Sequence, residues 1–318
     1  MKRLVLLTAG FVVFLFVGAV PASADNGPHK MGAGPIADTC ASCHRVHTAK
    51  APRLLKETQS ALCYTCHGPG ATGANNDVVN GVGYSGAERS GGVAGGLRGG
   101  GFKYALIESD NPSGYKGEGV IPVRAEGEEV SSTHSVDTSE QTAWGWSKEG
   151  TTPEFGKVIK LSCGNCHDPH GNGNYRILRT TPRELASKGE VAPEVAIPDA
   201  TTKVYTTTNY WRTDDVNALG YAEKVSAWCT TCHTRYLADH QGSTYSGDPV
   251  YSYRHSTAST SQGAGQRNCV QCHVSHGSNS SMGANSASVT FPDGSAAGAD
   301  SRLLRADNRG VCQICHAK

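Results

Sequence analysis

The sequence is short of the apolar side chains from which a protein of 318 residues normally builds its interior. Hydrophobic residues make up 37% of the chain, against about 45–50% in ordinary globular domains. Glycine, which loses more conformational freedom on folding than any other residue, occurs 39 times. Side-chain burial alone would therefore struggle to offset the entropy lost on folding. We expect either partial disorder or a core supplied by something other than side chains.

The chain also lacks a charge excess and, after its first residues, any long apolar run. A net charge of +1 gives no reason to expect binding to nucleic acid or to an anionic membrane. The one extended apolar stretch, residues 4–20, follows two basic residues and precedes the small-residue sequence Ala22-Ser23-Ala24. This order predicts a secretory signal peptide over residues 1–24, which is removed, and an exported chain without a membrane span.

No cysteine stands alone in the sequence. The twelve cysteines form C-x-x-C pairs, and a histidine directly follows every pair. The cysteines are Cys40, Cys43, Cys63, Cys66, Cys163, Cys166, Cys229, Cys232, Cys269, Cys272, Cys312 and Cys315. The histidines behind them are His44, His67, His167, His233, His273 and His316. A disulfide framework or zinc sites would account for paired cysteines, but neither requires a histidine after each pair.

The C-x-x-C-H pattern is instead the attachment signature of c-type haem. The two thiols bond to the vinyl groups on one edge of the porphyrin, and the histidine lies under the iron as its proximal ligand. The repeats therefore predict six covalently attached haem c groups, whose apolar rings would supply the missing interior. We expect a multihaem c-type cytochrome fold, mostly irregular coil with short α-helices and few β-strands wrapped around a haem chain, in a single domain over residues 25–318.

Seven further histidines are candidates for the distal iron ligands. They are His29, His47, His134, His170, His240, His255 and His276. The other soft candidates are Met31 and Met282. If histidine binds both faces of all six irons, six of these seven histidines serve as distal ligands and one is left over. We expect the spare to be His29 or His240 and take His29 as the ligand. Bis-histidine ligation predicts low-potential haems without an open iron position.

Three candidate ligands stand three residues after a proximal histidine, in CHRVH, CHDPH and CHVSH at the first, third and fifth sites. They are His47, His170 and His276. Such a side chain cannot reach the far face of its own iron, because the porphyrin lies between them. We therefore expect each to ligate the iron of a neighbouring haem, and so to hold two haems close together. The alternative is a hydrogen bond in the second coordination shell.

The segments between the sites predict little regular structure. The best strand candidates are residues 120–123, 157–161 and 203–211, and residues 181–190 are the best short helix. Residues 81–101 hold ten glycines, which indicates either a flexible linker or backbone that passes tightly over a haem face. Residues 277–300 are rich in Ser, Gly and Ala, which predicts a surface loop.

In the order of its sites and their flanking words, the chain resembles the OmcS-like family of six-haem outer-surface c-type cytochromes, which polymerise into extracellular conducting filaments. The matching sequence segments are CASCHRVH, CYTCH, STHSVD, CGNCHDPHG, YRIL, SAWCTTCH, YRHSTA, CVQCHVSH and CQICHAK. The resemblance implies bis-histidine haems in one continuous stack of alternating parallel and perpendicular pairs. It also implies that His47 reaches into the adjacent subunit and ligates the haem on Cys269, Cys272 and His273 there.

The function that these patterns predict is long-range extracellular electron transfer by a head-to-tail homopolymer at the outer surface of the cell. A contact of this kind does not close on itself and builds an open filament. The donors would be outer-membrane or periplasmic cytochromes, and the acceptors would include metal oxides. A monomeric periplasmic or outer-membrane-associated shuttle is the alternative. A multihaem reductase is the third candidate, but an enzyme needs an open haem, so we expect a protein that is not an enzyme.

Overall fold

The computed structural model of the chain describes residues 39–86, 89–105, 128–145, 156–172, 174–182, 221–236, 269–282 and 302–307, together with residues 29, 296 and 298. Several sequence predictions lie outside these ranges: the signal peptide, the strands at 120–123 and 203–211, the helix at 181–190 from residue 183 onward, and the residues Met31, His240, His255, Cys312, Cys315 and His316.

Short helices form at the described C-x-x-C-H motifs. They are α2 (Thr39–Cys43), α3 (Gln59–His67), α4 (Cys163–Cys166), α6 (Tyr221–Cys229) and α7 (Cys269–Cys272). One helical turn puts residues three apart on the same side, which is what two thiols aimed at one porphyrin edge need. The amide of the following histidine closes the turn, for example by donating to the Cys163 carbonyl from His167 at 2.9 Å.

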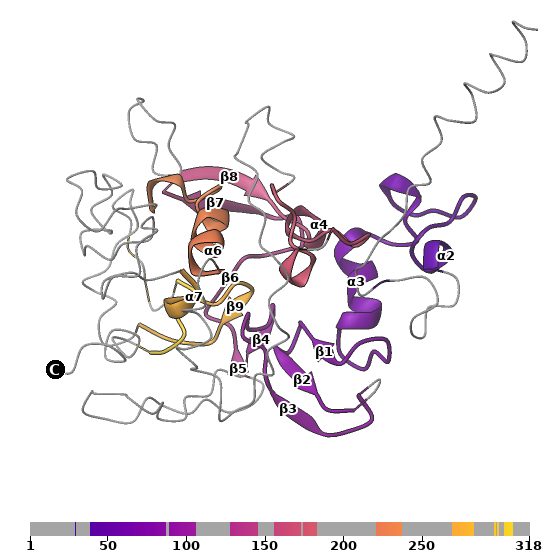
Figure 1. The fold of residues 1–318 in the computed structure, drawn as a ribbon, viewed down its shortest axis with the longest axis horizontal. Helices are drawn as coiled ribbons and strands as arrows, with labels where there is room; N and C mark the ends of the chain where they lie inside the picture. The colour runs from indigo at the N-terminus through magenta and orange to yellow at the C-terminus, as the bar shows by residue number, and fades with distance from the viewer. Residues whose placement is uncertain are drawn as a thin grey trace, which may run out of the picture.

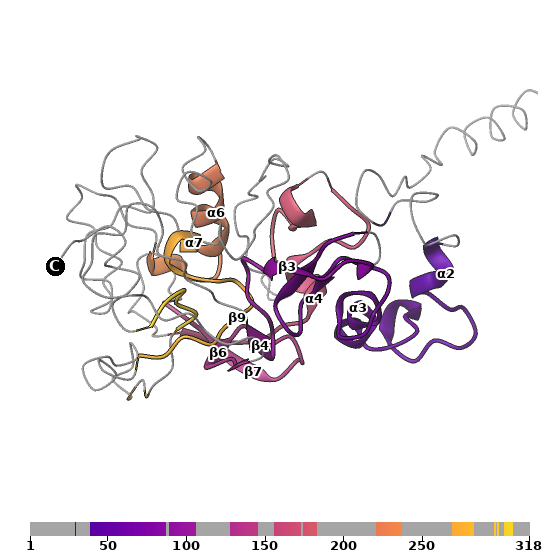
Figure 2. The same cartoon turned by 90° about the horizontal axis from the view of Figure 1, so that it is seen from below.

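These helices follow one another along the long axis of the molecule in chain order, from α2 through α3 and α4 to α6 and α7 (Figures 1 and 2). They also pack in pairs, because α3 contacts α4 and α6 contacts α7. This order of the helices places the cysteine pairs in a row. Among the described residues, no helix reaches the length and apolar character that crossing a bilayer requires.

The strands are short and form four small antiparallel sheets. The members are β1 (Asn76–Asp77), β2 (Val82–Tyr84) and β3 (Val93–Gly96) in one sheet, β4 (Tyr104–Ala105) with β5 (Glu128–Glu129), β6 (Ser132–Thr133) with β9 (Gly277–Ser278), and β7 (Glu140–Trp144) with β8 (Gly156–Lys160). Strand β8 confirms the strand that we predicted at residues 157–161. The rest of the described chain is largely turns and bends, as expected for a polypeptide with few apolar runs.

The β6–β9 pair joins the middle of the chain to its last quarter, with Ser132 opposite Ser278 and Thr133 opposite Gly277. The predicted surface loop is therefore wrong for residues 277–280, which are buried. Their backbone is paired in the sheet, and the Asn279 amide donates to the Ala105 carbonyl at 3.2 Å. Small polar residues suit a solvent loop and a close backbone contact equally well, so composition could not separate the two.

The glycine-rich segment 81–101 is not a flexible linker, because it contains β2 and most of its residues are half-buried or buried. The segment does pass tightly, but against other backbone; its passage over a haem face stays a prediction. A Cβ on Gly100, whose φ is +71°, would lie 1.8 Å from the Gly277 carbonyl oxygen. A Cβ on Gly101 would lie 2.1 Å from the Tyr104 carbonyl oxygen. The neighbours that exclude a side chain here are backbone atoms.

Apolar packing among the described residues is confined to three small clusters. The first contains Ala105, Val274 and Ala306, the second contains Ala143, Ile159 and Leu161, and the third is built on Val225. Each cluster packs against a motif cysteine: Cys272, Cys232 and Cys229, respectively. The apolar surface is therefore concentrated where the cysteine side chains lie, which agrees with the low hydrophobic content of the chain.

Candidate haem centres

Each described histidine that follows a C-x-x-C pair donates a hydrogen bond from Nδ1. The pairs are His44 with Arg53 O at 2.9 Å, His67 with Asn76 Oδ1 at 2.5 Å, His167 with Arg176 O at 2.9 Å, His233 with Trp144 O at 2.6 Å and His273 with Arg302 O at 2.8 Å. Carbonyl oxygens only accept, so the Nδ1 atom carries the proton. The Nε2 atom keeps its lone pair for a metal, which is the usual arrangement of a metal-binding histidine.

A second repeat, which the sequence analysis missed, provides three of these carbonyl oxygens. It reads RLLK at 53–56, RILR at 176–179 and RLLR at 302–305, and it accompanies the first, third and fifth sites. The arginine carbonyl accepts from the proximal histidine, and the next carbonyl accepts from the amide after that histidine, for example from Asp168 to Ile177 at 2.7 Å. The sequence signal that could have revealed this repeat is the pattern R-(L/I)-L-(K/R).

The same repeat has an unusual backbone. Two consecutive residues adopt left-handed conformations in every copy, with φ of 63° and 59° at Arg53 and Leu54, 51° and 52° at Arg176 and Ile177, and 54° and 62° at Arg302 and Leu303. L-residues other than glycine rarely do this, at a cost of roughly 1–2 kcal/mol each. Persistent strain at one kind of position indicates a functional constraint. Here the turn aims a carbonyl oxygen at the proximal imidazole.

The second motif forms the end of the longer helix α3, and the fourth motif begins at the last residue of the longer helix α6; the two helices share the sequences SALC and SAWC. In α3, the Cys63 thiol donates to Cys163 of α4, and this hydrogen bond is the main reason that the pKa of Cys163 falls to about 7. In α6, the Cys229 thiol bonds to Cys269 of α7 in the same way and lowers its pKa. The first cysteines of sites two and three are therefore neighbours, and so are those of sites four and five.

In the remaining neighbouring sites, the second cysteines influence each other's pKa. Burial and then the nearby Cys66 thiolate raise the pKa of Cys43. Burial and then Cys232 raise the pKa of Cys166 to about 12. From site one to site five, the cysteines of each site therefore lie close enough to those of the next site to influence their pKa. The order of these five sites in space is their order in the sequence.

Four pairs of histidine rings face each other across a nearly constant separation. The ring centres are 6.1 Å apart in His29–His67, 6.3 Å in His44–His170, 6.2 Å in His134–His233 and 6.4 Å in His167–His276. Each pair consists of one proximal histidine and one candidate distal histidine. In the pairs that contain His170 and His276, the partner belongs to a different site, as expected for the H-x-x-H histidines.

This separation fits a metal ion between the rings. A metal–imidazole bond is about 2.0 Å long, and the ring centre lies about 1 Å behind the bonding nitrogen, so two rings on opposite sides of one ion should be about 6 Å apart. The Nδ1 hydrogen bonds also support a metal ion between the rings, because they leave the Nε2 atom free to bind it. The described residues therefore fit haem iron with two axial imidazoles at the first four sites.

Desolvation lowers the pKa of six imidazoles among the proximal and distal histidines, to about 4 in His233 and about 3 in His276. The others are His67, His134, His167 and His273. Their rings are neutral at pH 7, and the neutral ring is the form that binds a metal.

Distal histidines are also held in place by hydrogen bonds. His29 donates from Nδ1 to the Pro169 carbonyl at 2.8 Å, and His134 donates to the Ser275 carbonyl at 2.9 Å. The β6–β9 sheet connects two of them directly, because the His134 amide donates to the His276 carbonyl at 2.9 Å. The distal ligands of the third and fourth sites are therefore fixed to each other by the backbone.

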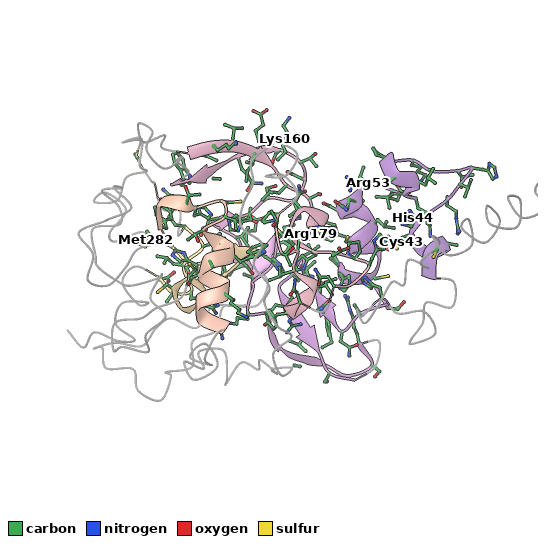
Figure 3. The ribbon with its side chains drawn as sticks, turned by 45° about the horizontal axis from the view of Figure 1, so that its top comes forward. Cys43, His44, Arg53, Lys160, Arg179 and Met282 are labelled. Atoms are coloured by element: carbon green, nitrogen blue, oxygen red, sulfur yellow. The ribbon has the colours of Figure 1, made fainter. Side chains whose placement is uncertain are left out.

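Two predicted ligands are not brought together with a partner. His47 is exposed on the chain just after α2, and within the described ranges no second imidazole ring faces His273. Met282, one of the two alternative soft ligands, lies on the opposite side of the molecule from Cys43, His44 and Arg53, which gather beside α2 (Figure 3). No three His, Cys, Asp or Glu side chains come together as a candidate metal cluster in the part of the chain that the structure describes.

Comparison with known proteins agrees with this chemistry. Residues 34–72, which include the first two C-x-x-C-H sites, match the family described as Doubled CXXCH motif. No curated protein and no solved structure matches the chain. The doubled motif indicates a multihaem c-type cytochrome, in which covalently bound haem c serves electron transfer.

Proposed function

We propose that the chain is a six-haem c-type cytochrome that carries electrons over long distances outside the cell and polymerises head to tail into a conducting filament. The observation that carries the proposal is the row of consecutive C-x-x-C-H sites with facing imidazole pairs. A bound haem would supply a one-electron iron couple at each site. The cysteines hold the ring, and the paired histidines occupy both axial positions, so no position is left for a substrate.

The arrangement of the sites suits a conduit. The helices that carry them follow each other along the long axis (Figure 1), and the cysteines of successive sites are close enough to affect each other's pKa. Helix pairs α3–α4 and α6–α7 each join an even site to the next odd site. By the same rule the sixth site would pair with the first site of a neighbouring subunit, which continues the series.

The α2 end of the molecule supports a contact between subunits. Val46, the residue before the exposed His47, is 74% exposed, and Leu54, whose carbonyl accepts from the Arg45 amide at 2.8 Å, is 49% exposed. An apolar patch around an unused imidazole is suited to an interface. His273 needs a distal ligand, so we propose that the neighbour's copy of His47 provides it. The contact uses two different surfaces and does not close, as an open filament requires.

The test is the variant His47→Ala, with Thr48→Ala as the control for a change on the same exposed segment. We expect His47→Ala to retain six covalent haems by mass and pyridine haemochrome but to form no filaments in electron micrographs of sheared cell-surface material. Thr48→Ala should polymerise normally.

Normal filaments from His47→Ala would refute the cross-subunit ligand. A wild-type protein that is monomeric at the cell surface or in the periplasm, with all of its haems, would favour the shuttle. The same preparations test the proposed export, because the mature chain should begin at residue 25.

A further inference from the structure

The backbone around His276 is fixed on two sides. Its amide donates to the Gly99 carbonyl at 2.7 Å, which ties it to the glycine-rich segment. Its carbonyl accepts from the His134 amide at 2.9 Å and from Thr133 Oγ1 at 2.8 Å, which ties it to β6. The Cα position of this distal ligand is therefore well determined, and what remains to be set is the rotation of its ring.

An aromatic ring lies against the imidazole face. Phe102 stacks on His276 with ring centres 4.6 Å apart and an angle of 25° between the planes. Phe102 is held in turn, because its amide donates to the Val78 carbonyl at 2.9 Å and Tyr64 packs on its ring at 6.4 Å. Gly99 leaves room nearby, since a Cβ there would lie 3.1 Å from His276 Nδ1. A flat neighbour on its face restricts how the imidazole can turn.

The four facing pairs differ in how their rings are turned. The angle between the imidazole planes is 66° in His167–His276 and 64° in His29–His67, but 51° in His134–His233 and only 19° in His44–His170. In the pair that contains His276, the His167 ring is fixed by its hydrogen bond to the Arg176 carbonyl at 2.9 Å. The crossed geometry of this pair therefore depends on the ring of His276.

We propose that Phe102 is a positioning residue that holds the His276 imidazole crossed against that of His167 and so sets the electronic character of the third haem. The inference rests on the proposed ligation of that haem by the two histidines. An imidazole donates π electrons through the orbital perpendicular to its plane. Crossed rings donate to two different iron d orbitals and leave them close in energy, whereas parallel rings donate to the same orbital and split the two.

The electron paramagnetic resonance spectrum of the oxidised full-length protein reports this splitting. Crossed ligands give a single strongly shifted line at large g, and parallel ligands give a rhombic spectrum with a smaller largest g. The variant Phe102→Leu removes the flat neighbour, so we expect the large-g line of the third haem to broaden and to move to lower g, with six haems retained. Phe102→Tyr keeps the ring and should leave the line in place.

The line is assigned with His276→Ala, which should remove it and produce one high-spin haem. If His276→Ala leaves every low-spin line intact, the proposed ligation fails, and the inference fails with it. If His276→Ala removes the line but Phe102→Leu, with all haems attached, leaves it unchanged, the inference about Phe102 alone is refuted.

If Phe102→Leu loses haem, the variant Gly99→Ala still tests the orientation of the His276 ring. Gly99→Ala places a methyl group against the same imidazole, so it should shift the same line without touching Phe102. An unchanged line in Gly99→Ala together with haem loss in Phe102→Leu would overturn the proposal, because the ring orientation would then not respond to its neighbours.

Discussion

At the scale of single residues, the two kinds of histidine are distinguished by their neighbours. A proximal histidine follows its cysteines and donates to an oxygen that the same site or a neighbouring strand provides, such as Asn76 Oδ1 or Trp144 O. A distal histidine comes from elsewhere in the chain. His134, for example, directly follows β6 and faces His233, which lies about a hundred residues later. Its role depends on tertiary structure.

Removal of one distal ligand should expose one iron. In His134→Ala, we expect the haem on Cys229 and Cys232 to become five-coordinate and high-spin, because no other described imidazole faces His233. About one haem in six should then bind carbon monoxide, as seen in the difference spectrum of the reduced protein.

The matched control is His240→Ala, since His240 is the histidine that we take as the spare. It should bind no carbon monoxide, and neither should the wild-type protein. Carbon monoxide binding by the wild type would point to an open haem and favour the reductase. Binding by His240→Ala would show that His240 ligates an iron and is not the spare.

At the scale of elements, the R-(L/I)-L-(K/R) turns are the feature that most constrains the odd-numbered sites. Each turn keeps two non-glycine residues at positive φ, and each aims a carbonyl at a proximal imidazole. A strained turn of this kind persists only where the surrounding contacts over-determine it.

Substitution at the exposed Arg53, whose φ is 63°, should show the backbone strain directly. Arg53→Gly relieves it and should stabilise the protein by about 1 kcal/mol after the extra entropy of the unfolded glycine is subtracted. Arg53→Val should destabilise it, because a β-branched residue tolerates positive φ least. The measurement is the guanidinium midpoint of unfolding.

Both variants keep the backbone carbonyl that accepts from His44, so haem content is expected to be unchanged. The contrary result would be equal midpoints for the glycine and valine variants, which would mean that the turn relaxes freely.

At the scale of the whole molecule, the described polypeptide has three small apolar clusters, each of which packs against motif cysteines. Side chains alone do not build one continuous interior in these ranges. The apolar rings that the cysteines would hold therefore have to complete it, which is why the composition can be so poor in hydrophobic residues.

Loss of a central haem should accordingly loosen the fold. In the double variant Cys163→Ser with Cys166→Ser, we expect the native-state proteolysis rate to rise on the order of tenfold or more, because its rate follows the population of opened molecules. The matched control is Cys40→Ser with Cys43→Ser, at the α2 end of the row (Figure 2). It should produce a smaller rise confined to the N-terminal region. Equal, small effects at both sites would contradict a core made of haem.

Part of the fold and of the site follows from sequence alone. The cysteine pairs, the histidines behind them, the short helical turns and the strand at β8 all depend on local spacing, and local spacing is readable in one dimension. The chain composition likewise predicts a sparse side-chain core, and the described clusters agree with it. These properties are set by neighbours a few residues apart.

Only the tertiary structure decides which imidazoles face each other, how their planes are turned, and where the glycine-rich segment runs. His44 meets His170, and His276 lies under Phe102, because chain segments far apart in the sequence are paired by backbone hydrogen bonds and by packing of neighbouring helices. Contacts of that range leave no periodic signal in the sequence, since any of seven histidines satisfies the same chemical requirement and geometry alone selects among them.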